Sequence, residues 1–331
     1  MSDGPDCILS VENLRTRFGS DRAGATVVDG VSFTMKRGLT TALVGESGCG
    51  KSVTALSVMG LIDPPGRILS GKVLLDGVDL LKASEQEMET IRGARIGMIF
   101  QDPLASLNPA LTIGLQITET ILAHRDIGPI AAERQAIELL TRVGVQDAAR
   151  RIHDYPHHFS GGMRQRVLIA AAISCSPSII IADEPTTALD VTVQAKILLL
   201  LHNLQKEMRA SLLLITHDLG VVASMADEVL VMYAGRIVER ADVDTLFHHP
   251  RHPYTKALLG CVAGIEDDRS VPLEPIAGAA PDLRNPPRGC RFAPRCIMAR
   301  DICWVQDQPL VSVSHDHAVA CILAQPEAAH A

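Results

Sequence analysis

Eight consecutive residues, Gly45-Glu46-Ser47-Gly48-Cys49-Gly50-Lys51-Ser52, have the types and the spacing needed to hold phosphate groups. They fit the pattern of a glycine, four residues, then Gly-Lys-Ser. Glycines allow backbone N–H groups to turn inward around phosphate oxygens, and a following helix adds partial positive charge. Lys51 would reach the β- and γ-phosphates, and the Ser52 hydroxyl would ligate Mg²⁺. The sequence therefore predicts a nucleotide site.

Two acids and a histidine stand where a nucleotide-hydrolysing site needs them. The apolar run 178–182 ends in Asp183 and Glu184, and the run 212–216 ends before His217. Asp183 can hold Mg²⁺, and Glu184 can polarise an attacking water. Because ligands bind at the carboxyl ends of parallel strands, these residues are expected near the phosphate loop.

Two further segments are candidates for nucleotide contact. Ser160-Gly161-Gly162 opens a predicted helix with Ser160 as N-cap, and its bare N–H groups predict a second anion site, although a structural cap is an alternative. Phe18 ends the first predicted strand, where its ring could stack on adenine or, as is more usual, pack in the core.

The elements that must position these residues are short strands alternating with helices. Apolar runs predict strands, helical spacing of apolar residues predicts a helical block over 111–151, and residues 8–39 alternate as antiparallel strands do. We expect an α/β fold with strands over 27–33, 40–44, 71–77, 95–101, 178–184 and 212–216.

Composition excludes several other classes of protein. The chain has 331 residues, 47 % of them hydrophobic, a net charge of −7 and 3 % aromatic residues, which disfavours nucleic-acid binding. The N-terminus has no signal-peptide pattern, and the longest apolar stretch, Val167–Ala182, is interrupted by Pro177 and three serines. A protein soluble in the cytoplasm is expected, and docking on a membrane partner stays open.

Taken in order, the motifs resemble those of ABC-transporter ATP-binding subunits over about residues 8–240. Gly45–Ser52 resembles Walker A, Ile179–Glu184 Walker B, and Gln101 the Q-loop. The signature motif, D-loop and switch histidine are matched by Ser160-Gly161-Gly162-Met163-Arg164-Gln165, Ala188-Leu189-Asp190 and His217. The resemblance implies a P-loop NTPase cassette with a RecA-like core, an antiparallel β-subdomain and a helical subdomain over about 103–175.

The resemblance also implies a mechanism. Two cassettes, identical or homologous, would pair head to tail and close over two ATP molecules, with Glu184 as general base and His217 at the γ-phosphate. Mg²⁺ would be held by Ser52, Gln101 and Asp183. The partner cassette would contribute Ser160, Gly161, Gly162, Met163 and Asp190. Phe159 and Met163 depart from the usual signature, but the glycines that would contact phosphate are present.

Two longer segments narrow the resemblance to the ATPases of dipeptide and oligopeptide permeases. They are Tyr155–Arg166, around the signature, and His252–Leu259, in an expected C-terminal extension over 241–331. The implied function is ATP hydrolysis that drives peptide import, at the cytoplasmic face of the membrane, with two permease subunits and a solute-binding protein as partners. Import of nickel or another small solute is an alternative, and a soluble ABC ATPase is a third reading that the single cassette and acidic charge disfavour.

Four of the eight cysteines, Cys290, Cys296, Cys303 and Cys321, crowd the C-terminus. They lack the C-x₂-C pairs of zinc ribbons, whereas four thiolates can hold a [4Fe–4S] cluster. Arg288, Arg291, Arg295 and Arg300 are expected to offset the negative charge of such a cluster. Some peptide-permease ATPases carry a similar cluster-binding tail, so an iron–sulfur cluster is favoured, with Zn²⁺ and free thiols as alternatives. The tail is expected to be irregular and held folded by the metal centre.

Overall fold

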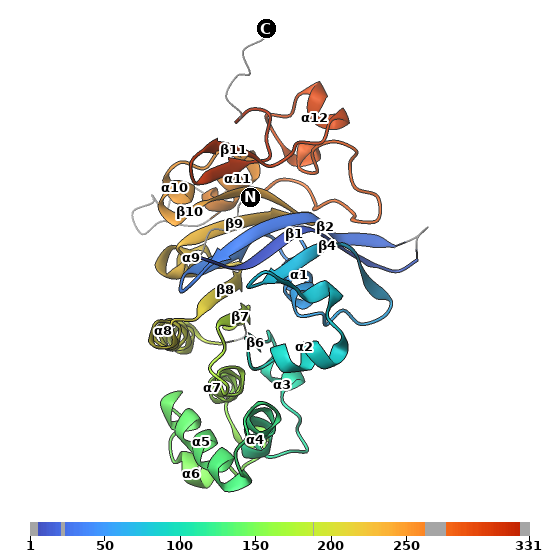
Figure 1. Cartoon of the computed structure of the whole chain (residues 1–331). Helices are drawn as coiled ribbons and strands as arrows, with labels where there is room; N and C mark the ends of the chain where they lie inside the picture. Colours follow the sequence, from blue (N-terminus) through green and yellow to red (C-terminus); the bar gives the residue numbers. More distant parts are fainter. Residues whose placement is uncertain (1–5, 21–23, 188, 262–275, 325–331) are drawn as a thin grey trace. The chain divides into compact units, whose positions relative to one another are not determined.

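The computed structural model describes residues 6–20, 24–187, 189–261 and 276–324. The chain divides into two compact units, coloured by sequence in Figure 1. The first unit combines Met1–Thr34, Thr40–Leu81 and Thr216–Ala331, and the second combines Met35–Leu39 with Lys82–Ile215.

An antiparallel sheet with the strand order β2-β1-β4-β5 forms one layer of the first unit. Burial alternates along the second half of β2, and β1 pairs antiparallel with β4, which confirms the antiparallel strands expected over residues 8–39. Phe18 ends β1, as expected, opposite Gly66 of β4. The strands are β1 (Cys7–Phe18), β2 (Ala25–Lys36), β4 (Gly66–Leu75) and β5 (Val78–Asp79).

A second layer of the first unit has the strand order β11-β12-β10-β9-β3. Every residue of β3 is buried, and β3 runs parallel to β9 in the register Leu43↔Leu230, so the chain leaves β3 directly into the phosphate loop. The strands are β3 (Thr40–Val44), β9 (Glu228–Tyr233), β10 (Arg236–Asp242), β11 (Val311–Ser314) and β12 (His317–Val319). The helices of this unit are α1 (Lys51–Val58), α9 (Leu219–Met225), α10 (Val243–His248), α11 (Pro253–Gly260) and α12 (Asp301–Val305).

The C-terminal tail differs from the irregular extension that the sequence predicts. Its hairpin β11–β12 pairs with β10, and the Ala320 N–H donates to the Val238 carbonyl at 2.8 Å. Phe292 packs edge-on against Tyr233 and tilted against Tyr254, with ring centroids 5.2 and 5.4 Å apart. The tail therefore shares the core of the first unit, where Phe292 packs on aromatic side chains that lie outside the tail.

The second unit is built on the parallel strands β8-β7-β6, paired in the registers Ile96↔Ile179 and Ile179↔Ser211. The predicted strands and the helical block are confirmed, and Pro177 lies in the turn between a helix and β7. The elements are β6 (Ile96–Ile99), β7 (Ile179–Asp183), β8 (Ser211–Thr216), α2 (Glu85–Ile91), α3 (Pro103–Ser106), α4 (Ile113–His124), α5 (Pro129–Arg142), α6 (Ala148–Arg151), α7 (Gly161–Ala172) and α8 (Val191–Met208). Across the described parts of the chain, no helix has both the length and the apolarity needed to span a bilayer.

Candidate nucleotide site

The phosphate loop connects β3 to α1, and two of its glycines are required by close backbone packing. Gly45 and Gly50 have φ angles of 152° and 109°. A Cβ atom at Gly45 would lie 2.1 Å from the Met232 carbonyl oxygen, and one at Gly50 would lie 2.5 Å from that of Val27. A side chain at either position would clash with these carbonyl oxygens, so both positions require glycine.

Lys51 is held inside this loop. Its Nζ donates to the carbonyl oxygens of Gly45, at 2.8 Å, and of Glu46, at 3.0 Å, and the residue is 4 % exposed. Cys49 is also buried, and burial raises the pKa of its thiol, so it packs as a neutral side chain. The ammonium group of Lys51 is thus fixed at the loop, beside the N-terminus of α1.

In the second unit, the structure brings Gln101 and Glu184 together. Asp183 ends β7 and is 5 % exposed. Glu184 follows with a φ of 44°, anchored by its N–H to the Ile215 carbonyl at 2.9 Å. Its Oε2 accepts hydrogen bonds from the Gln101 Nε2 at 2.8 Å and from the Thr187 hydroxyl at 3.0 Å. These bonds orient the carboxylate predicted to act as general base.

Thr187 is a contact of Glu184 that the sequence motifs do not predict. The signal that could have found it is local, because Thr187 stands three residues after Glu184 and its N–H closes a turn onto the Glu184 carbonyl at 3.1 Å.

The signature residues lie at the start of α7, as expected, with Ser160 at the N-cap but without a side-chain capping bond. A Cβ atom at Gly162 would lie 2.6 Å from Val193 Cγ1 of α8, whereas one at Gly161 would meet nothing closer than 3.5 Å. Packing against α8 therefore explains the glycine at position 162. Only Gly161 still supports the predicted anion site. Asp190 caps α8, where its Oδ1 accepts from the Val193 N–H at 2.9 Å.

The remaining predicted residues are placed as follows. Met163, on α7, accepts a contact from the Arg151 Nη1 at 3.6 Å. Phe18 is half-buried at the end of β1, and His217 is exposed between β8 and α9. Ala188 lies outside the described residues. Their roles toward a nucleotide stay predictions.

The four late cysteines line one small cavity of about 10 Å³, together with His252, Phe292 and other residues. Burial raises the pKa of Cys290, Cys296 and Cys321, so their thiolates need a compensating positive charge there. Within the described ranges, no group of three or more His, Cys, Asp or Glu side chains is arranged as a metal site. The convergence of four thiols fits a metal centre by donor chemistry, while their arrangement does not show one.

Two of the arginines expected to offset a cluster are paired elsewhere. Arg291 donates to Asp29 and to the Ala234 carbonyl, and Arg295 forms a fork with Glu46 of the phosphate loop. Acidic partners on the rest of the first unit attract these guanidinium groups, so they tie the tail to the cassette.

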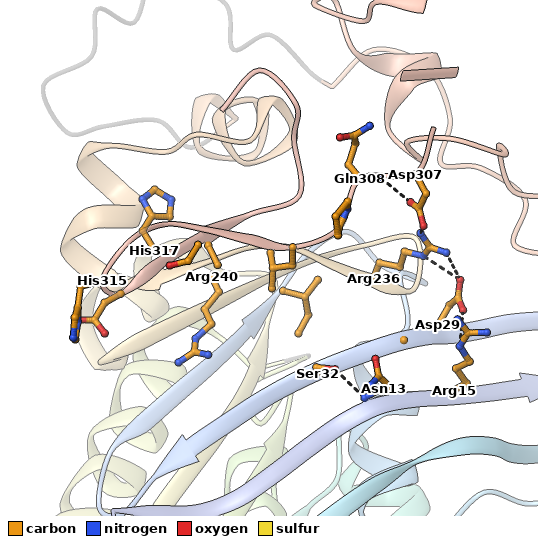
Figure 2. Close-up of a pocket in the computed structure, with 17 residues that line it drawn as sticks. Asn13, Arg15, Asp29, Ser32, Arg236, Arg240, Asp307, Gln308, His315 and His317 are labelled. Carbon is orange, nitrogen blue, oxygen red and sulfur yellow. Dashed lines mark hydrogen bonds and ion pairs between the residues drawn. The ribbon is translucent and has the colours of Figure 1, made fainter. Parts of the chain in front are cut away.

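Asp29 of β2 is the centre of a network beside a cavity of about 690 Å³ (Figure 2). Arg236 donates to Asp29 Oδ2 at 3.0 and 2.7 Å and also pairs with Asp307 of the tail. Burial alone would raise the pKa of Asp29, but the hydrogen bonds and charges of Arg236, with Arg291 and Arg15, hold it below its ordinary value. The network joins β2, β10 and the tail.

Comparison with known proteins places both parts of the chain. Residues 28–187 match the ABC transporter family, and residues 238–303 match the oligopeptide/dipeptide transporter C-terminal region.

Curated relatives match nearly the whole chain. The oligopeptide transport ATP-binding protein OppD of Bacillus subtilis (strain 168) is 49 % identical over 322 residues, which cover 97 % of this chain and 90 % of the relative. The dipeptide transport ATP-binding protein DppD of Escherichia coli (strain K12) is 46 % identical over 314 residues, 95 % of this chain and 96 % of the relative.

Solved structures of ATP-binding cassettes share the fold. The dimeric cassette MJ0796, in a post-hydrolysis state bound to ADP and Pi, has a TM-score of 0.64 and 26 % identity, covering 71 % of this chain and 98 % of that one. The cassette cbiO1 of Clostridium perfringens, part of the transporter complex cbiONQ, has a TM-score of 0.62 and 27 % identity, covering 74 % and 92 %. The chain is an ATPase cassette and belongs to the ABC-transporter ATP-binding proteins of the oligopeptide and dipeptide transport family.

Proposed function

We propose that the chain binds and hydrolyses ATP to drive import of dipeptides or oligopeptides across the cytoplasmic membrane. The observation that carries this proposal is the similarity to peptide-transport ATP-binding proteins over nearly the full length, the C-terminal region included. The chain would act at the cytoplasmic face as a peripheral subunit, paired with a second cassette and bound to two permease subunits that receive peptide from a solute-binding protein.

The roles of the site residues follow from their chemistry. Lys51 and the loop N–H groups would bind the β- and γ-phosphates, and Ser52, Gln101 and Asp183 would hold Mg²⁺, which supplies charge neutralisation when bound. Glu184, oriented by Gln101 and Thr187, would accept the proton of the attacking water.

The opposing wall of each ATP site would come from a second cassette. That second cassette would present Ser160, Gly161, Gly162, Met163 and Asp190. His217 of the cassette that holds the phosphate loop would contact the γ-phosphate. The exposed start of α7 supports the assignment, since Ser160 and Gly161 are accessible to a partner.

We keep residues 8–240 as the cassette, 103–175 as its helical subdomain and 241–331 as the extension. Helix α3 begins at Pro103, the first residue of the proposed subdomain, and α7 ends at Ala172, close to its last residue. Strand β10 runs through position 240, so the extension begins within the sheet and not after it.

For the four-cysteine cavity we propose a [4Fe–4S] cluster, with Zn²⁺ as the alternative. Cys290, Cys296, Cys303 and Cys321 would hold it, and its chemistry at this position is structural. Anaerobically purified protein is expected to be brown and to contain iron and sulfide in equal amounts. Colourless protein with stoichiometric zinc would contradict the cluster and support the alternative.

Transport is tested by reconstitution. The chain is placed in liposomes with its permease subunits, its partner cassette and the solute-binding protein, and ATP hydrolysis and peptide uptake are measured. Peptide-loaded binding protein should stimulate both, and Lys51→Ala should abolish both, because the phosphate contact is lost. Stimulation by nickel and not by peptides would overturn the substrate.

A further inference from the structure

The tail contacts the phosphate loop through a partly buried ion pair made of two parallel hydrogen bonds. Arg295 Nη1 donates to Glu46 Oε2 at 2.7 Å, and Arg295 Nη2 donates to Glu46 Oε1 at 2.9 Å. The side chain of Arg295 is 5 % exposed and that of Glu46 is 26 % exposed. Parallel bonds between a guanidinium and a carboxylate combine charge with fixed geometry, so this contact sets the direction of the Glu46 side chain.

The guanidinium itself is locked from other sides. Its Nε donates to the Ala277 carbonyl at 2.9 Å and its Nη2 donates to that of Ile276 at 3.2 Å. Its Nη1 also lies 3.4 Å from the Tyr233 hydroxyl. Arg295 is therefore a fixed positive charge beside the loop, one residue before Cys296.

A second residue C-terminal to the predicted cassette holds the backbone at the same position. The Glu46 N–H donates to the Tyr254 hydroxyl of α11 at 2.9 Å, and Tyr254 is fully buried. Burial raises the pKa of Tyr254, so its hydroxyl stays neutral and serves as an acceptor. The backbone and the side chain of Glu46 are thus both held by residues beyond position 240.

An acid inside a phosphate-binding loop is an electrostatic liability, because its charge repels the triphosphate. Since Arg295 neutralises that charge with a fork, the loop can keep an acid at this position. We propose that Arg295 is a positioning residue of the nucleotide site, which directs and neutralises Glu46 and so makes the four-cysteine tail a determinant of ATP affinity. The proposal rests on the assignment of Gly45–Ser52 as the phosphate loop.

The test measures the affinity of the full-length chain for ATP, by competition with a fluorescent ATP analogue. Arg295→Ala should weaken ATP binding about tenfold, because an uncompensated carboxylate then stands in the phosphate loop. Adding Glu46→Ala should restore affinity to within about twofold of the parent, since the repelling charge is gone. Raising the salt to about 0.5 M should shrink the Arg295→Ala loss to less than about threefold by screening.

Two controls make the outcome specific. Arg284→Ala removes a tail arginine that pairs only with the exposed Asp282 within the described contacts, and it should leave ATP affinity unchanged. Arg295→Lys keeps the charge but not the two parallel hydrogen bonds, and it should weaken ATP binding about threefold. This variant tests the proposal if Arg295→Ala does not fold.

The proposal is overturned if folded Arg295→Ala binds ATP like the parent. It is equally overturned if the double variant is as weak as Arg295→Ala, or if the loss does not respond to salt, because the effect is then loop distortion. Lys51→Ala tests the phosphate-loop assignment separately from the role of Arg295. Unimpaired ATP binding in that variant would refute the assignment itself.

Discussion

At the scale of single residues, backbone and side-chain hydrogen bonds hold Glu184, the residue proposed as general base. Its left-handed backbone, its anchor to Ile215 and its bonds from Gln101 and Thr187 fix the carboxylate. The sequence indicated the acid because it stands at the end of a strand, and it indicated Gln101 through the resemblance to the Q-loop. It could not indicate that the two side chains touch, since 83 positions separate them.

Replacement of this carboxylate tests its role. Glu184→Gln should bind ATP with unchanged affinity and lose at least about 100-fold in hydrolysis, because an amide cannot accept the proton of the attacking water. Phosphate release and ATP binding are measured side by side. Glu207→Gln, at an exposed acid of α8 that pairs with Arg142, is the matched control and should keep full activity. Unimpaired hydrolysis in Glu184→Gln would show that another group is the base.

At the scale of elements, glycines and ion pairs set how neighbouring segments approach. The Cβ-free face of Gly162 lets α7 and α8 pack, and Asp29 ties β2 to β10 and the tail. Apolar runs and turn residues predicted β3, β7 and β8 closely, because buried parallel strands carry a strong local signal. The hairpin β11–β12 carries little such signal, since its pairing depends on a strand about 80 residues earlier in the chain, as in Glu239↔Val319.

The two signature glycines should behave differently when a methyl group is added. Gly162→Ala should lower the free energy of unfolding by about 1–3 kcal/mol, because the new methyl meets the stiff side chain of Val193. Gly161→Ala should leave it unchanged or raise it by about 0.5 kcal/mol, since only Leu189 lies near, at contact distance. Urea denaturation of both variants gives the comparison, and equal stabilities would contradict the packing explanation.

Asp29 should contribute strongly to the free energy of unfolding, because it is the shared partner of a mostly buried network. Asp29→Ala should cost about 3–5 kcal/mol of unfolding free energy, because Arg291, 8 % exposed, loses its carboxylate partner. Arg15→Ala, at the 53 % exposed member of the network, should cost less than about 1 kcal/mol. Thermal or urea unfolding distinguishes the two, and similar losses would argue against a buried network.

The lowered pKa of Asp29 predicts that the folded protein loses stability in acid. Since the folded-state pKa of Asp29 lies below its ordinary value of 3.8, its contribution is complete above that value and is lost as the pH falls through the lower folded value. Thermal midpoints measured from pH 6 down to about pH 2 should therefore fall less steeply at the acid end for Asp29→Asn than for the parent. Parallel curves would contradict the assignment.

At the scale of the whole chain, sequence-distant segments share one core. Tyr233 of β9, Tyr254 of α11 and Phe292 of the tail form an aromatic cluster with ring centroids 4.5 to 5.4 Å apart. Motif spacing predicted the cassette and the presence of a tail. It could not predict that the tail packs against and forms ion pairs with the cassette, because contacts such as Arg295–Glu46 join positions 249 residues apart.

Loss of one ring should show how strongly the tail is held. Phe292→Ala should lower the free energy of unfolding by about 3–4 kcal/mol, because it opens a cavity among buried aromatic side chains. Trp304→Ala, at a 49 % exposed aromatic residue of the same tail, should cost less than about 1 kcal/mol. Denaturant unfolding decides, and a small effect of Phe292→Ala would mean that the tail is only loosely attached.

The pairing of β12 with β10 bears on how hybrid transporters can be built. A cassette cut at residue 240 and fused to foreign sequence would end inside β10 and would lack the strand that covers its edge. Uncovered edge strands recruit other chains and promote aggregation. A cassette donated from this protein should therefore be taken together with its tail through Cys321, so that the unit of exchange is larger than the unit of catalysis.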